Sequence, residues 1–150
     1  PSYYEGKDEA ACYRRYFESV LENLQTFGEM DAYGHLDYVV RYGPSKNAHY
    51  TYDAYADLLE PILDILIEKQ TALELNTAGF KYGLGHPNPH EDILRRYREK
   101  GGELITVGSD AHAPEHLAFD FSKVGSILQN AGFRYYTIFR NRNPIMLPFA

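Results

Sequence analysis

The hydrophobic residues of this chain recur with two different periods, which predict helices and strands in alternation. From Asp8 to Gly28 they recur at steps of three and four residues, as on one face of an amphipathic helix. Asp8 is the candidate N-cap of this helix and Gly28 its stop signal. Residues 72–76 instead alternate between apolar and polar side chains, as in a strand with one buried face.

The same patterns continue through the rest of the chain. Helices are expected over residues 55–67, 89–100 and 120–130, and Pro61 should kink the first of these or delay its start to about Glu60. Further strands are expected just before His35, over 104–107 and over 135–139, and 141–150 reads as a tail. Such alternation is typical of an α/β fold with parallel strands, here four. Because the series opens on a helix, we expect a fragment of a longer βα series.

Composition restricts the possible functions. The 150 residues carry a net charge of −6 without a basic patch, so nucleic acid and anionic membranes are poor partners. No apolar run is long enough to cross a bilayer. The single cysteine, Cys12, cannot form an internal disulfide and fits a reducing cytoplasm.

Asp110 and His112 follow the apolar run 104–107. In an extended backbone, side chains two residues apart point to the same side, and α/β enzymes keep their chemistry at the carboxyl ends of strands. Carboxylate and imidazole groups are good ligands for zinc, manganese or iron. This pair is a candidate metal site.

His35 and Asp37 repeat this arrangement after another strand. The two pairs could meet at one rim and share a metal. The alternative is that His35 caps a turn and Asp37 caps the following helix.

Arg41 and Asn76 complete the candidate site. Arg41 lies close enough to the rim to hold a phosphate through two parallel hydrogen bonds, although it could equally be a surface arginine paired with a carboxylate. Glu74 and Asn76 share one face of their strand and could contact substrate or brace other site residues.

Three ordered motifs resemble the histidinol-phosphatase branch of the PHP (polymerase and histidinol phosphatase) superfamily. The opening Tyr4–Lys7 and the closing Asn143-Pro144 are also similar. The motifs are Tyr33-Gly34-His35-Leu36-Asp37-Tyr38 with Arg41-Tyr42, Leu73-Glu74-Leu75-Asn76-Thr77-Ala78-Gly79, and Gly108-Ser109-Asp110-Ala111-His112 with Pro114-Glu115.

The resemblance implies a distorted (β/α)7 TIM-like barrel with up to three divalent metal ions (zinc, manganese or iron), which hydrolyses L-histidinol phosphate in histidine biosynthesis. By position, His35, Asp110 and His112 would bind metal and take part in catalysis. Arg41 would bind the substrate phosphate, and His112 or His116 would assist the leaving alkoxide. The family's N-terminal His-x-His pair has no counterpart here, so residues 1–150 would form the C-terminal portion of a single PHP barrel domain, inactive alone.

Two other functions stay open. One is a PHP phosphoesterase acting on another substrate, such as a nucleotide. The other is a non-catalytic fragment whose polar strand ends are structural. Exposed strand edges would also allow pairing with another chain, including a homo-oligomer.

Overall fold

A three-stranded parallel sheet forms the centre of the fold. The computed structural model describes residues 3–112, 114 and 120–149. The strands lie in the order β1 (Ala32–Tyr33), β2 (Ala72–Asn76) and β3 (Ile105–Gly108). Tyr33 lies opposite Leu73, and Asn76 lies opposite Gly108. The carboxyl ends of all three strands therefore meet at one edge of the sheet.

The first helix confirms its predicted start. Helix α1 (Glu9–Thr26) begins after Asp8, whose carboxylate accepts a hydrogen bond from the backbone N–H of Ala11 at 2.9 Å. This bond satisfies one of the N–H groups that the first turn leaves without a partner. The helix ends at Thr26, with Phe27 as its C-cap, just before the predicted stop signal Gly28.

The second helix starts at the beginning of the predicted region 55–67 and not at its delayed alternative. Helix α2 runs from Ala56 to Glu68 after the 3-10 turn η2 (Asp53–Tyr55) and passes through Pro61, so the expected start near Glu60 is wrong. Pro61 removes one N–H bond to the carbonyl of the exposed Asp57, which water can satisfy. The loss is small beside the burial of four apolar side chains on the other face, namely Leu59, Ile62, Leu63 and Leu66.

The remaining helices follow the predicted pattern closely. Helix α4 (Glu91–Glu99) follows the N-cap His90, and α5 (Val124–Ala131) ends at Gly132, which adopts the left-handed conformation that glycine tolerates best. A 3-10 turn, η4 (Phe121–Lys123), precedes α5. The stretch 78–89, rich in glycine, proline and asparagine, contains the short helix α3 (Ala78–Lys81).

The last strand corrects the prediction of four parallel strands. Strand β4 (Tyr135–Arg140) pairs antiparallel with β5 (Asn143–Pro148), where the sequence suggested a tail. The turn residues Asn141 and Arg142 both have positive φ, 51° and 63°, as a two-residue hairpin turn requires. Proline is tolerated in β5 because an edge strand does not need every N–H. The pattern analysis missed this strand because the turn lacks glycine and the segment carries prolines.

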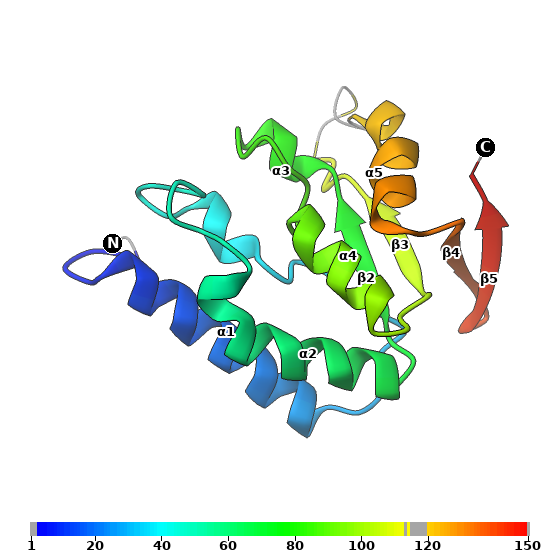
Figure 1. The fold of residues 1–150 in the computed structure, drawn as a ribbon, viewed down its shortest axis with the longest axis horizontal. Coiled ribbons are helices and arrows are strands. Elements are labelled where there is room, and N and C mark those ends of the chain that lie inside the picture. The colour runs from blue at the N-terminus through cyan, green and yellow to red at the C-terminus, as the bar shows by residue number, and fades with distance from the viewer. Residues whose placement is uncertain (1–2, 113, 115–119, 150) are drawn as a thin grey trace.

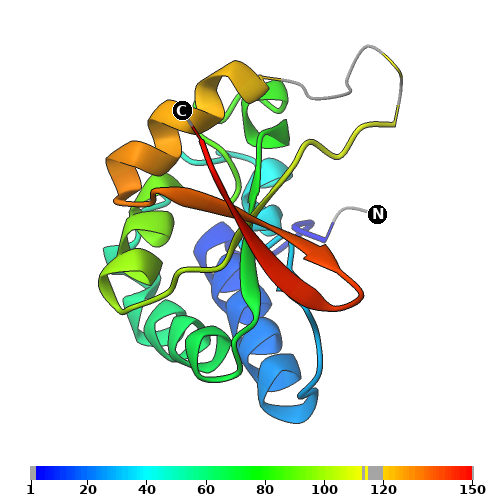
Figure 2. The same cartoon turned by 90° about the vertical axis from the view of Figure 1, so that its right-hand side faces the viewer.

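The helices α1, α2, α4 and α5 pack in this order beside the strands (Figure 1). Figure 2 shows the β4–β5 hairpin crossing in front of the strands of the parallel sheet. It is tied to the sheet by a hydrogen bond of 3.1 Å from the backbone N–H of Ile105 to the Thr137 hydroxyl. The core lies between sheet and helices, with Phe17, Leu73 and Ile93 fully buried. Among the described residues, no helix is both long and apolar enough to cross a membrane.

Candidate active site

The carboxyl edge of the sheet gathers polar side chains around the carboxylate of Glu74. The flanking residues Gly34 and Gly108 leave room for it, because a Cβ would lie 2.9 Å from Glu74 Oε2 at Gly34 and 2.5 Å from Glu74 Oε1 at Gly108. The amide of Asn76 donates to Glu74 Oε2 at 3.3 Å. As predicted, Glu74 and Asn76 lie on one face of β2. The missing side chains of Gly34 and Gly108 leave the space that the Glu74 carboxylate occupies.

Asp110 is the centre of the contacts at this edge. Its Oδ1 accepts a hydrogen bond from Asn76 Nδ2 at 2.8 Å, and its Oδ2 accepts one from Arg41 Nη1 at 2.7 Å. His35 Nδ1 lies 3.7 Å from the same Oδ2. Burial raises the pKa of Asp110, but the bonds from Arg41 and Asn76 outweigh it, and the net pKa lies below its usual value. Asp110 is therefore an anion that can attract a cation.

Arg41 is buried, unlike a surface arginine. Its side chain is 1% exposed, and its guanidinium carbon lies 5.1 Å from the centre of the Tyr38 ring and 4.9 Å from that of Tyr82. Arg41 belongs to the 3-10 turn η1 (Tyr38–Arg41). One of its nitrogens, Nη2, is buried and has no hydrogen-bond partner among the described residues. An unsatisfied buried donor is costly, so this atom indicates a place for a bound anion.

Asp37 does not join the candidate metal site. It is fully buried and accepts hydrogen bonds from Tyr50 Oη at 3.0 Å, Asn88 Nδ2 at 2.6 Å and the backbone N–H of His90 at 2.8 Å. The expectation that it points the same way as His35 is wrong because the backbone is not extended. His35 has φ of 61°, and Asp37 has φ of −112° with ψ of 30°.

The pair Asp110 and His112 meets the same obstacle. Asp110 has φ of 47°, so the extended geometry that would put both side chains on one side is absent. His112 is exposed. His116, the other predicted histidine, lies outside the described residues.

The donor chemistry at the rim still fits a divalent cation. Two ligands of one tetrahedral zinc ion lie about 3.4 Å apart, close to the separation of His35 Nδ1 and Asp110 Oδ2. Over residues 3–112, 114 and 120–149, no three His, Cys, Asp or Glu side chains gather closely enough to hold a metal ion. The residues present can thus supply part of a metal site.

Sequence reasoning missed Asn88. It lies in the Gly/Pro/Asn-rich stretch between α3 and α4, and its backbone pairs with that of Asn76 through hydrogen bonds of 2.8 and 2.9 Å. Its side chain contacts both Arg41 and Asp37. No periodicity marks such a residue; the only sequence signal is an asparagine held between two prolines.

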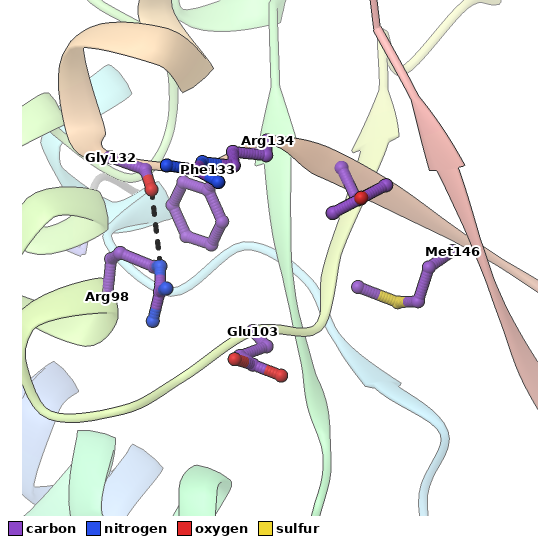
Figure 3. A pocket seen from close by; sticks show the side chains of 7 residues that line it. Arg98, Glu103, Gly132, Phe133, Arg134 and Met146 are labelled. Atoms are coloured by element: carbon purple, nitrogen blue, oxygen red, sulfur yellow. Dashed lines mark hydrogen bonds between the residues drawn. The ribbon is translucent and has the colours of Figure 1, made fainter.

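A cavity of about 470 Å³ lies elsewhere, beside the segments that precede β3 and β4 (Figure 3). Arg98 and Glu103 line it, and Arg98 Nε donates to the carbonyl of Gly132 at 3.2 Å. None of the predicted site residues that the structure describes line this cavity. The chemistry of the carboxyl edge, and not cavity size, therefore locates the candidate site.

Comparison with known proteins settles the family. The model of the PHP domain matches residues 1–78. The chain belongs to the PHP domain family. Over 126 residues, 83% of this chain and 51% of the relative, it is 37% identical to a probable histidinol-phosphatase of Thermotoga maritima. Over 136 residues, 89% of this chain and 48% of the relative, it is 32% identical to the histidinol-phosphatase of Lactococcus lactis.

A solved PHP structure shares the fold. The crystal structure of histidinol phosphate phosphatase from Lactococcus lactis, complexed with zinc, L-histidinol and phosphate, superposes with a TM-score of 0.81 at 29% identity. The superposition covers 95% of this chain and 54% of that protein. The chain spans about half the length of the curated relatives it matches.

Proposed function

We propose that this chain forms part of a metal-dependent phosphatase that hydrolyses L-histidinol phosphate to L-histidinol and phosphate. The observation that carries the proposal is the buried guanidinium of Arg41, which lies beside the pair of Asp110 and His35. Within the part of the chain that the structure describes, its Nη2 has no hydrogen-bond partner. Relatives of 37% and 32% identity are named histidinol-phosphatases, which favours this substrate over a nucleotide.

Each site residue has a distinct role in this proposal. His35, Asp110 and His112 hold a divalent cation, which can be zinc, manganese or iron. Such a metal lowers the pKa of bound water and neutralises charge on phosphate oxygens. Arg41 donates from Nη2 to a phosphate oxygen, and its charge stabilises the negative charge that the transferring group carries.

Two residues act on the substrate side. Asn76 fixes Asp110 Oδ1 by its hydrogen bond of 2.8 Å and lines the substrate pocket. His116, or His112 in its place, assists the leaving alkoxide.

The proposed domain is one PHP barrel, of which residues 1–150 form the C-terminal portion. The parallel order β1–β2–β3 with the helices α1, α2 and α4 beside it supports this proposal, because such a barrel is built from alternating parallel strands and outer helices. In this arrangement the remaining strands supply the further ligands of a cluster of up to three metal ions. The chain alone is then inactive, because two or three ligands cannot hold the whole cluster.

A hybrid protein tests this proposal. The segment of the Thermotoga maritima relative that matches this chain is replaced by the chain itself, and phosphate release from histidinol phosphate is measured with added zinc or manganese. The proposal expects turnover by the hybrid and its loss on Arg41→Ala. Hydrolysis of nucleotide monophosphates but not of histidinol phosphate would contradict the substrate, and no release from either would contradict the activity.

A further inference from the structure

The guanidinium of Arg41 is held in one orientation by two hydrogen bonds on different edges. Its Nε donates to Asn88 Oδ1 at 2.6 Å, and its Nη1 donates to Asp110 Oδ2 at 2.7 Å. A guanidinium is planar and rigid, so two such bonds fix its plane and its rotation within that plane. The direction in which the unpartnered Nη2 points is thereby set before any ligand arrives.

Asn88 itself has no freedom to turn its amide. Its Nδ2 donates to Asp37 Oδ1 at 2.6 Å, and a carboxylate can only accept hydrogen bonds. A flipped amide would place its oxygen against the carboxylate, which is also an acceptor, and its NH2 against the guanidinium, which is also a donor. The backbone of Asn88 is fixed as well, because it exchanges two hydrogen bonds with Asn76 in β2.

Asp37 anchors this arrangement inside the protein. A buried carboxylate is stable only when hydrogen bonds replace its water, and Asp37 receives two more, from the Tyr50 hydroxyl and the backbone N–H of His90. The carboxylate therefore connects three segments: η1, the loop before α2 and the start of α4. Its position depends on the fold and not on any ligand.

We infer that Asn88, held by Asp37, is a positioning residue that aims Nη2 of Arg41 at the phosphate group of the substrate. The identity of that anion rests on the function proposed above. A guanidinium is positively charged and offers only donors, so an oxyanion is the partner that suits the open donor on Nη2. A guanidinium that is already oriented loses less entropy when an anion binds. Removal of the Asn88 amide should therefore weaken anion binding although the positive charge of Arg41 remains.

The test compares Asn88→Ala with Asn47→Ala. Asn47 is a matched control because its amide also donates to a fixed acceptor, the carbonyl of Leu84 at 2.6 Å. In the described part of the chain, the Asn47 side chain forms no hydrogen bond with Arg41. Binding of inorganic phosphate is measured by titration calorimetry on the 150-residue chain, and KM and kcat for histidinol phosphate are measured on the hybrid. Asn88→Ala should weaken phosphate binding and raise KM by about tenfold or more, as is usual for supporting residues, while Asn47→Ala leaves both unchanged.

A double variant separates positioning from general damage. If Asn88 acts through Arg41, Arg41→Ala with Asn88→Ala should bind phosphate no more weakly than Arg41→Ala alone. Should Asn88→Ala fail to fold, Asn88→Ser replaces it. The shorter serine side chain cannot reach both Arg41 Nε and Asp37 Oδ1, so this variant should also weaken phosphate binding.

Three results would overturn the inference. The first is that the Asn88 variants bind phosphate as tightly as Asn47→Ala does. The second is that the losses of phosphate affinity from Arg41→Ala and Asn88→Ala add up in the double variant. The third is that the unmutated chain binds no phosphate. Failure of the proposed function looks different. In that case the unmutated hybrid releases no phosphate from histidinol phosphate, while the dependence of phosphate binding on Asn88 persists in the chain.

Discussion

Gly79 offers a sharp test of the packing behind the candidate site. It is buried in the short helix α3, where an alanine would ordinarily stabilise the protein by about 0.5–1 kcal/mol through lower chain entropy. In this structure, however, a Cβ at Gly79 would lie 2.3 Å from the carbonyl oxygen of His86, 2.9 Å from the carbonyl carbon of Pro87 and 3.1 Å from the backbone nitrogen of Asn88. We predict that Gly79→Ala destabilises the protein.

The magnitude follows from what must move. The clashing atoms belong to the backbone of residues 86–88, so no side-chain rotation relieves them, and Asn88 is bonded to both Asn76 and Arg41. Overpacking costs about 1–3 kcal/mol, and a backbone clash falls in the upper half of that range. After the favourable alanine effect, a net loss of about 2 kcal/mol remains. For a chain of this size it corresponds to a fall in Tm of about 4–8 °C.

Gly125 in α5 supplies the control, because a Cβ there meets nothing within 4 Å. Thermal unfolding of Gly79→Ala, Gly125→Ala and the parent is followed by far-UV circular dichroism. Gly125→Ala should raise Tm by about 1–4 °C, the opposite sign for the same chemical change. If both variants raise Tm, the close approach of α3 to residues 86–88 is refuted.

The remaining predictions concern single interactions. Thr137→Val should lower the free energy of unfolding by about 1–3 kcal/mol, because it leaves the buried N–H of Ile105 unpaired. Thr137→Ser keeps the hydroxyl and should retain most of the parent's stability. Equal losses for the two variants in urea unfolding would argue against this bond. Hydrogen bonds from Arg96 hold the pKa of Glu60 at about 2, so its contribution is present above its unfolded pKa of about 4.3 and is lost as pH falls toward 2. Glu60→Gln should make the loss of stability on acidification smaller, by only about 1 kcal/mol because Glu60 is partly exposed. Parallel curves of Tm against pH for the parent and the variant would contradict the prediction. Asp8→Ala should cost about 1 kcal/mol while Asp8→Asn costs less, and indistinguishable Tm values for the two would exclude a capping role.

The sequence by itself determined the elements whose signal is local. The helix after Asp8, the strand at residues 72–76 and the end of α5 at Gly132 each depend on periodicity, capping or a glycine within a few residues. It also placed His35, Asn76 and Asp110 at strand ends and Arg41 close to the same rim, and the structure brings these four together. The metal and substrate roles of the predicted site residues stay predictions, to be tested in the hybrid.

Only the tertiary structure decided which way the site residues face. Asp37 and Asp110 both follow a strand, yet left-handed backbone at His35 and at Asp110 breaks the two-residue alternation, and Asp37 turns into the core. Likewise, Asn88 matters because its loop folds back onto β2, which no local pattern encodes. The physical reason is the same in each case: a buried polar group takes its direction from the partners that satisfy it, and those partners lie tens of residues away along the chain.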